Sequence, residues 1–249
     1  MSDNPNQNTI GWHRARLGNI TGSAVGQLMG KPKSGDFSQT ALAYLHQIAF
    51  ERCMNPIIVN DDDLFSQYLS LTQVKSKAIL WGRKMEGEAA DLFSEMYYKL
   101  YGSKSEAPYV LQLEEPSSVK SEEFEHFAAS PDRMFYDPET GEQCCVEIKS
   151  PQGQAFFKYL NKVFFPETQE KRLAGLKSAE ANYYWQVYAE MLATGASKTY
   201  FVVYNPFETH PLHVLKIDRD EEVLTQLREK ILLAEAYIED LVKHYSNSK

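Results

Sequence analysis

The spacing of apolar residues along the chain predicts helices towards both ends and strands in the middle. Ala90, Phe93 and Tyr97, for example, recur at the spacing of a helix that buries one apolar stripe. Helices are expected at residues 38–52, 80–100, 154–160, 179–193 and 220–245. A further short helix is expected to begin with a cap at Thr21 or Ser23 and to end at Gly30.

Strand patterns fill the middle of the chain, and residues 163–177 are expected to form a loop. The expected strands are 109–113, 124–129, 134–136, 143–149, 198–204 and 213–217. Helices before and after these strands predict an α/β or α+β fold with a central mixed β-sheet flanked by helices.

No repeat or flexible linker divides the chain, which indicates one domain over residues 1–249. Its expected parts are an N-terminal helical region at about 12–100, a sheet at about 107–217 and a C-terminal helix at about 220–245.

Composition indicates an ordinary soluble protein: 43% of the 249 residues are hydrophobic and 24% are charged. The N-terminus lacks an apolar signal segment, and no later stretch is long and apolar enough for a membrane span, so an intracellular protein is expected.

Cys53, Cys144 and Cys145 lack metal-site spacing and are expected to be free thiols. His13 and His126 have no second histidine at ligand spacing and are expected to be packed or exposed.

The net charge of −8 argues against a nucleic-acid partner, because phosphate binding usually leaves a basic footprint. A nuclease can still be acidic overall, since acids gather at its metals and DNA needs only a local positive patch. Residues 11–33 offer such a patch with no acid among them: His13, Arg14, Arg16, Lys31 and Lys33.

The segment SPDRMFYDPETGEQCCVEIKS carries the most informative chemistry. Successive strand side chains point to opposite faces, so Val146 and Ile148 are expected in the core. Glu147 and Lys149 then share the other face, and the turn signal DPETG predicts a hairpin-like return that brings Asp132 beside them. Two carboxylates are a minimal site for a hard cation such as Mg²⁺, with the Lys beside the attacking water. The segment therefore favours a metal-dependent nuclease.

Each candidate residue also has an ordinary structural explanation. Glu-x-Lys pairs often decorate solvated strand faces. Glu86 continues an apolar stripe towards the core, where it is either solvated at the stripe edge, paired with Arg83, or partnered by a metal or a metal-ordered water. Gln186 lies within YYWQVYAEM, whose aromatic residues are expected in the core. As a donor and an acceptor, it could also hold a phosphate oxygen or an active-site water.

Five segments together resemble the phage lambda-type exonucleases, the viral recombinase branch of the PD-(D/E)xK nuclease superfamily. They are WHRARLGNITGS at 12–23, GRKMEGEAA at 82–90, SPD at 130–132, VEIK at 146–149 and YWQ at 184–186. Their order and spacing match the family, and together they span residues 12 to about 195. Nothing specific is matched beyond that point.

The resemblance assigns roles to named side chains. The implied active-site residues are Asp132, Glu147, Lys149, Glu86 and Gln186. The implied metal ligands are Asp132, Glu147 and the backbone carbonyl of Ile148. The residues that match the family's binding site for the 5′-phosphate of a DNA end are Arg16, Ser23 and Ser130.

The resemblance also implies an activity and a setting. The fold would be a restriction-endonuclease-like PD-(D/E)xK core. The enzyme would digest one strand of linear double-stranded DNA from 5′ to 3′, leaving 3′ single-stranded tails for recombination by strand annealing. Two Mg²⁺ ions, or Mn²⁺ in their place, would lie roughly 3.5 to 4 Å apart in each site. Lys149 would orient or deprotonate the water, although acting as a base requires a pKa below the usual value of about 10.4.

Further implications are a ring-shaped trimer around DNA, a phage single-strand annealing protein as partner, no membrane association, and a phage- or prophage-encoded protein in the bacterial cytoplasm. The best-known member of the family has an additional active-site Asp about ten residues before the position of Asp132. Here that position is Glu122, in a cluster with Glu123 and Glu125, and which acid replaces the Asp stays open.

Two alternatives remain. A structure- or site-specific DNA endonuclease on the same core would cut closed circular duplex. A non-catalytic DNA-binding protein on the nuclease scaffold would have no reason to keep the acids and the Lys together. An iron–sulfur nuclease is disfavoured by the three cysteines and their spacing.

Overall fold

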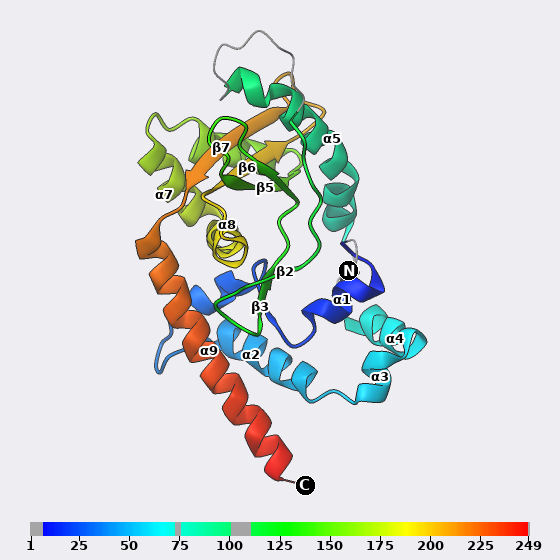
Figure 1. Ribbon diagram of the computed structural model, residues 1–249. Coiled ribbons are helices and arrows are strands. Elements are labelled where there is room, and N and C mark those ends of the chain that lie inside the picture. The colour runs from blue at the N-terminus through cyan, green and yellow to red at the C-terminus, as the bar shows by residue number, and fades with distance from the viewer. Residues whose placement is uncertain (1–6, 73–75, 101–110, 249) are drawn as a thin grey trace.

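A four-stranded mixed sheet lies in the upper part of the protein as drawn in Figure 1. The computed structural model describes residues 7–72, 76–100 and 111–248. In spatial order the strands are β4 (Arg133–Tyr136), β5 (Gln143–Lys149), β6 (Lys198–Tyr204) and β7 (Leu212–Asp218). β5 and β6 are parallel, whereas the two outer pairs are antiparallel. The predicted central mixed sheet is confirmed, and β5 and β6 have the predicted bounds.

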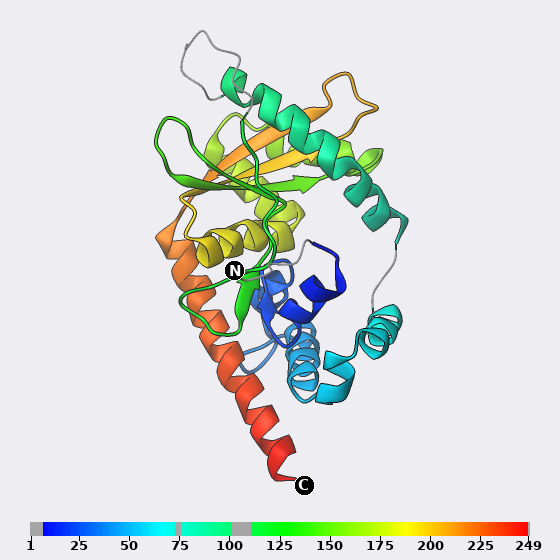
Figure 2. The same cartoon turned by 45° about the vertical axis from the view of Figure 1, so that its right-hand side comes forward.

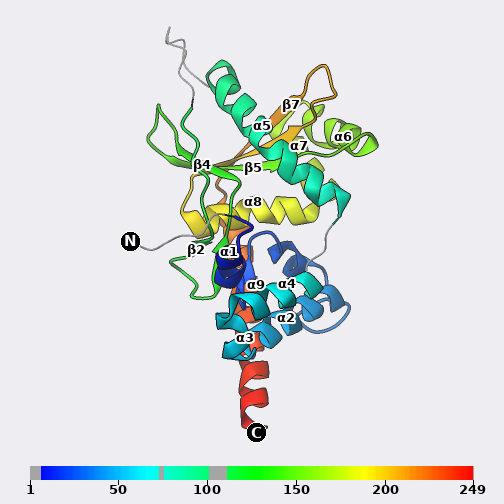
Figure 3. The same cartoon turned by 90° about the vertical axis from the view of Figure 1, so that its right-hand side faces the viewer.

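Helices cover both faces of this sheet (Figures 2 and 3). One face packs against α5 (Lys77–Leu100), and the opposite face packs against α8 (Ala181–Thr194). The alternation along β5 divides its side chains between the two: Val146 and Ile148 join the apolar cluster of α5. Glu147 consequently faces α8, as its hydrogen bond to Gln186 shows. The two predicted helices, α5 and α8, therefore enclose the end of β5 from opposite faces of the sheet.

The N-terminal helices and the last helix form a second layer beyond α8. These elements are α1 (Ile10–Arg16), α2 (Gln39–Arg52), α3 (Pro56–Asn60), α4 (Asp62–Thr72) and α9 (Glu221–Asn247). α9 begins beside the sheet and runs along α2 to the C-terminus (Figure 1). Arg52, at the end of α2, joins the two helices because its guanidinium donates to both carboxylate oxygens of Glu235 in α9 at 2.9 Å.

A small second sheet links α1 to the central sheet. Its strands lie in the order β1 (Ile20–Thr21), β3 (Phe127–Ala129) and β2 (Val119–Lys120). β1 pairs in parallel with β3, so residues far apart in sequence become neighbours. Because Ser130 follows β3 directly, this pairing brings the segment after α1 beside the start of the SPD motif.

Several predicted elements differ from the observed ones. The predicted loop at 163–177 is wrong, because α7 (Gln169–Ala179) begins there with the Thr168 side chain as its cap. Only Leu176 of this helix is buried, so its apolar pattern is weak. α6 (Gln154–Tyr159) continues as a π-helix over Leu160–Phe164.

Gly175 is required where α7 crosses that π-helix. A Cβ at this position would lie 1.7 Å from the Lys162 carbonyl oxygen, so only glycine permits the approach.

Other corrections concern short segments. The short helix is a 3₁₀ helix, Val25–Met29, with no side-chain cap, so the predicted capping by Thr21 or Ser23 is wrong. Residues 111–113 form no strand; their neighbour Glu114 makes one isolated bridge to Met134, and residues 109–110 lie outside the described part. Sequence patterns also missed α1, α3, α4, β1 and β2. None of the helices in the described ranges is long and apolar enough to cross a bilayer.

Candidate active site

Asp132 directly precedes β4 and lies at an open edge, where β5 extends beyond the first residue of β4. The first ladder pair is Arg133 opposite Val146, so β5 extends beyond its neighbour by Glu147, Ile148 and Lys149. The Ile148 N–H, which has no β4 partner, donates instead to Oδ2 of Asp132 at 2.7 Å. Since the N–H and C=O of one strand residue point to the same side, the Ile148 carbonyl faces the same open edge. The predicted return of Asp132 to β5 is confirmed.

Glu147 is almost completely buried and is held by donors from two sides. Its side chain is 1% exposed, and Oε1 accepts from Nε2 of Gln186 at 2.6 Å. The Lys149 ammonium, which alternation places on the same face, donates to the same oxygen. Lys149 also lies over the Tyr183 ring, 4.5 Å from its centroid. Oε2 of Glu147 is buried without a hydrogen-bond partner in the described structure.

A second buried acid, Glu190, lies directly behind this pair on α8. Nε2 of Gln186 bridges the two carboxylates, donating to Glu190 Oε1 at 3.1 Å as well as to Glu147. Glu190 is 1% exposed, and its Oε2 is also buried without a partner among the residues described. The sequence signal for it was its position four residues after Gln186, on the same face of an otherwise apolar helix.

The acids of this cluster disfavour one another's ionisation. Burial and the neighbouring Glu147 raise the pKa of Asp132 well above its ordinary value. Burial and Glu147 likewise raise the pKa of Glu190. Burial acts to lower the pKa of Lys149, but the charges of Glu147 and Asp132 outweigh it and raise that pKa. Lys149 is thus held as a cation, which favours an orienting and charge-stabilising role over that of a base.

Glu86 reaches the site from α5, and its partner is Arg133. Nη1 of Arg133 donates to Glu86 Oε1 at 2.7 Å and to the Asp132 carbonyl at 2.5 Å. This pairing replaces both structural alternatives considered from the sequence, a solvated Glu86 and a pair with Arg83. Burial raises the pKa of Glu86, opposed by the Arg133 guanidinium. The sequence analysis did not identify Arg133, although this residue directly follows Asp132.

A pocket of about 340 Å³ opens where these groups meet. Among the residues that line it are Glu86, Asp132, Ile148, Lys149 and Tyr183. Glu147 and Gln186 lie behind Lys149 and do not line it. The Glu122, Glu123 and Glu125 cluster does not line it either, and Glu123 instead pairs with Arg228 of α9 at 2.7 Å.

The three candidate phosphate-binding residues form one hydrogen-bonded group. Nη1 of Arg16 donates to Ser130 Oγ and Nη2 donates to Ser23 Oγ, both at 3.0 Å. The guanidinium stacks on the Trp12 ring, 4.2 Å from its centroid. Burial lowers the pKa of Arg16 to about 10, and no carboxylate among the described residues bonds to it. A cation enclosed by hydroxyl groups in this way suits an anionic ligand.

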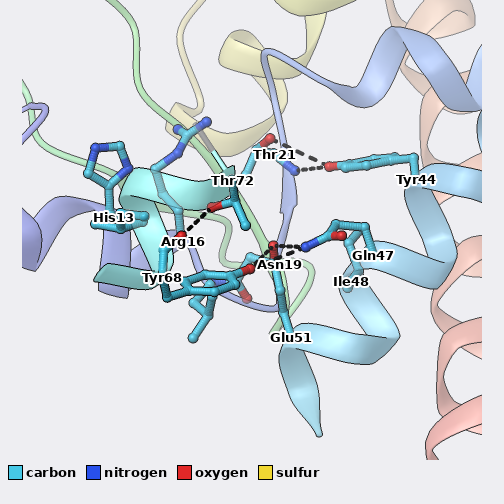
Figure 4. A pocket seen from close by; sticks show the side chains of 12 residues that line it. His13, Arg16, Asn19, Thr21, Tyr44, Gln47, Ile48, Glu51, Tyr68 and Thr72 are labelled. Atoms are coloured by element: carbon cyan, nitrogen blue, oxygen red, sulfur yellow. Dashed lines mark hydrogen bonds between the residues drawn. The ribbon is translucent and has the colours of Figure 1, made fainter. Parts of the chain in front are cut away.

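A larger pocket, of about 520 Å³, lies between α1, α2 and α4, and Arg16 is one of the residues that line it (Figure 4). Its one acid, Glu51, is already bonded by the Gly18 N–H and by Gln47. Figure 4 shows Tyr44 and Tyr68 at its walls, with their hydroxyls bonded within the protein. The only carboxylate among the described residues that line this pocket is thus already bonded within the protein, whereas the smaller pocket has Glu86 and Asp132 beside Lys149.

The oxygen donors at the edge of that smaller pocket and directly behind it fit a hard divalent cation. Glu147 Oε2 is a buried carboxylate oxygen without a partner, and Asp132 and the Ile148 carbonyl add oxygens at the same edge. Such cations prefer oxygen ligands. No group of three or more His, Cys, Asp or Glu residues is arranged around one point within the described ranges. The fit therefore rests on two carboxylates and one backbone carbonyl.

The predicted thiols and aromatic core are also confirmed. All three cysteines are free, and Cys144 and Cys145 are buried. Tyr184, Trp185 and Tyr188 of α8 are buried as expected.

Comparisons with known proteins agree with the family and the fold that the sequence predicts. Residues 11–197 match the family model described as YqaJ-like viral recombinase domain. Two solved structures of an alkaline exonuclease, LHK-Exo from Laribacter hongkongensis, are similar over nearly the whole chain. For the first, 19% of residues are identical, 96% of this chain and 97% of that chain are covered, and the TM-score is 0.68. The second, a complex with dAMP, has the same identity and coverage and a TM-score of 0.67.

A phage-related exonuclease from Haemophilus somnus is also similar, with 14% identity, 91% and 96% coverage, and a TM-score of 0.59. These likenesses confirm the predicted PD-(D/E)xK-type fold. No curated protein sequence matches the chain significantly.

Proposed function

The chain belongs to the YqaJ-like viral recombinase domain family, and on that premise we propose that it is a cation-dependent exonuclease acting on DNA ends. The observation that carries the proposal is the convergence of Asp132, Glu147 and Lys149 at the open edge of β5. Two acids and a protonated Lys at the end of one strand, together with a bound cation, would supply the Lewis acid, the water orientation and the charge stabilisation that phosphodiester hydrolysis uses. The similar structures named as exonucleases support the same reaction class.

Asp132, Glu147 and the Ile148 carbonyl are the residues that would hold the cation. Mg²⁺ or Mn²⁺ in that position would act as a Lewis acid on the scissile phosphate and its leaving oxygen. The predicted second ion stays a prediction.

Lys149, kept charged by its acidic neighbours, would orient the attacking water and stabilise the negative charge that develops on the phosphate. Gln186 fixes Glu147 through its 2.6 Å hydrogen bond, which keeps the acid facing Lys149.

Arg16, Ser23 and Ser130 would hold a terminal 5′-phosphate and so set the direction of digestion. Ser130 lies two residues before Asp132, which places the proposed anchor next to the proposed catalytic acid. An enzyme anchored on a 5′-phosphate would require an end, proceed from 5′ to 3′, and leave a 3′ single strand. A ring-shaped trimer, a phage single-strand annealing protein as partner, and action in the cytoplasm of a bacterial host are further parts of this proposal, supported by family membership.

The test uses linear duplex labelled separately at each 5′ end and each 3′ end, with Mg²⁺ and a closed circular control. We expect early release of 5′ label, persistence of 3′ label, no cutting of the circle, and faster digestion of 5′-phosphorylated than of 5′-hydroxyl ends. Arg16→Ala should reduce the preference for the phosphorylated end. Cutting of the circle would establish the endonuclease alternative, and binding without any cleavage would establish the non-catalytic one.

A further inference from the structure

One partner of the ion pair between Arg133 and Glu86, the Glu86 carboxylate, lines the pocket of the candidate active site. Glu86 lines the pocket together with Asp132 and Lys149, so a cation that enters the pocket meets this carboxylate. Its Oε1 is already bonded to the Arg133 guanidinium at 2.7 Å. The Glu86 side chain is 23% exposed and the Arg133 side chain 13%, so water screens their attraction only in part.

Arg133 still has hydrogen-bonding capacity. Both of its bonds within the described structure come from Nη1, to Glu86 and to the Asp132 carbonyl. Nε and Nη2 donate to no other described residue, and a guanidinium fork matches the spacing of two phosphate oxygens. Glu86 lines the same pocket as Asp132 and contacts the Arg133 guanidinium, so a phosphate bound beside Asp132 would lie near this side chain.

We propose that Arg133 couples cation binding to DNA binding by competing with the divalent cation for Glu86. This inference rests on the proposed function. In the free protein the guanidinium neutralises Glu86 and repels an incoming cation. When DNA binds, the guanidinium turns to phosphate oxygens and releases Glu86, and the affinity for the cation rises. Linkage makes the effect reciprocal, so the bound cation also strengthens DNA binding.

A purely structural ion pair between α5 and β4 is the rival explanation. It predicts that loss of Arg133 lowers the melting temperature without increasing the affinity for a cation. The competing-charge explanation predicts a gain in cation affinity, because removing a positive charge a few ångströms from a divalent ion removes repulsion. The two explanations thus differ in the sign of a binding effect that is measured without any turnover.

The experiment measures Mn²⁺ binding by electron paramagnetic resonance, with and without a hydrolysis-resistant phosphorothioate duplex that carries 5′-phosphates. We compare the wild-type protein with Arg133→Gln, Glu86→Gln and the double variant. Arg133→Gln should bind Mn²⁺ roughly five- to tenfold tighter without DNA. The gain in Mn²⁺ affinity on adding DNA should shrink by a similar factor, and in the Glu86→Gln background the Arg133 substitution should change little.

Two further variants act as controls. Arg83→Gln makes the same charge change on an exposed side chain of α5 that does not line the pocket, and it should leave Mn²⁺ affinity unchanged. Arg133→Lys keeps the charge but loses the fork, so it should retain weak Mn²⁺ binding without DNA while losing the gain on DNA binding. This variant decides the matter if Arg133→Gln does not fold.

The outcomes separate this inference from the proposed function. A wild-type protein that binds Mn²⁺ and digests DNA ends, combined with an Arg133→Gln variant that binds Mn²⁺ no tighter, overturns the coupling and leaves the exonuclease standing. A wild-type protein that binds no Mn²⁺ with or without DNA overturns both. Tighter binding by Arg133→Gln but not by Arg83→Gln supports the coupling.

Discussion

Two groups of buried charges lie at opposite ends of the same strands, and they are built differently. At the start of β5 and β6, Asp137 and Lys198 are each 7% exposed and face one another. Oδ1 of Asp137 accepts from the N–H groups of Glu139 and Thr140, and Oδ2 accepts from Lys198 at 3.3 Å. Lys198 also pairs with Glu142 at 2.9 Å. Both oxygens of Asp137 therefore have donors.

The group at the other end of β5 is unbalanced. Here four acids, Glu86, Asp132, Glu147 and Glu190, lie near two cations, Lys149 and Arg133. Two carboxylate oxygens, on Glu147 and Glu190, are buried without a partner in the described structure. A fully paired cluster stabilises a fold by itself, whereas surplus buried carboxylates are costly until a cation joins them. We infer from this difference that the first group is a structural ion pair and that the second is the proposed cation site.

Removing the Lys149 ammonium from the unbalanced group should have the largest effect. Lys149→Ala should reduce DNA cleavage by about a thousandfold, because it removes the charge that orients water and stabilises the transition state. Binding of a 5′-phosphorylated end should persist, since the anchor residues are untouched. Single-turnover cleavage and fluorescence anisotropy measure the two quantities. Near-normal turnover would contradict the role assigned to Lys149.

Removing the cation of the balanced group should instead affect stability. Lys198→Ala should lower the free energy of unfolding by about 3 kcal/mol, because Asp137 would lose its buried counter-ion. The remaining folded protein should cleave DNA at the normal rate per molecule. Urea denaturation measures the first and active-site-normalised cleavage the second. Lys216→Ala, on a lysine 39% exposed and paired with Asp218, is the matched control and should cost little.

Replacing an aspartate by asparagine should change the free energy of unfolding in opposite directions in the two groups. Asp132→Asn removes a carboxylate from the crowded site, so in EDTA it should raise the free energy of unfolding by about 1 kcal/mol while abolishing cleavage. Asp137→Asn should destabilise, because its carboxylate is matched by donors. Thermal unfolding in EDTA compares them directly. Destabilisation by both variants would mean that the crowded acids are already compensated in the cation-free protein.

The sequence predicted the positions of the candidate catalytic side chains better than it predicted the residues around them. Alternation placed Glu147 and Lys149 on one face, and the DPETG turn returned Asp132, because both signals are local in the chain. Arg133 and Glu190 were missed because their importance arises from tertiary contacts, with Glu86 on α5 and with Gln186 on α8.

The elements that the sequence did not predict are held by tertiary contacts rather than by a local apolar pattern. α7 buries one side chain, Leu176, so tertiary packing rather than an apolar stripe holds it. β1 and β2 have two residues each, too few for a periodic pattern, and exist because β3 pairs with both. The contact of Arg16 with Ser130 depends on that pairing, so spacing alone could not show that the anchor residues meet.

The smallest expected effect is a dependence of stability on pH at the balanced group. Burial acts to raise the pKa of Asp137, but the N–H groups of Glu139 and Thr140 and the Lys198 ammonium outweigh it and hold that pKa below its ordinary value. The folded state thus favours the ionised carboxyl. Its contribution is fully present above the unfolded pKa of about 3.9 and disappears as pH falls through the folded pKa.

Wild type and Asp137→Asn should accordingly differ by a constant free energy of unfolding between about pH 5 and 8, and the difference should shrink below about pH 4. We expect the pH-dependent part to stay near or under about 1 kcal/mol, measured by urea denaturation at each pH. Asp218→Asn, on a side chain 67% exposed, should show almost no such change. A difference that grows on acidification would mean that the carboxyl of Asp137 is disfavoured in the fold, and the contrast between the two charged groups would fail.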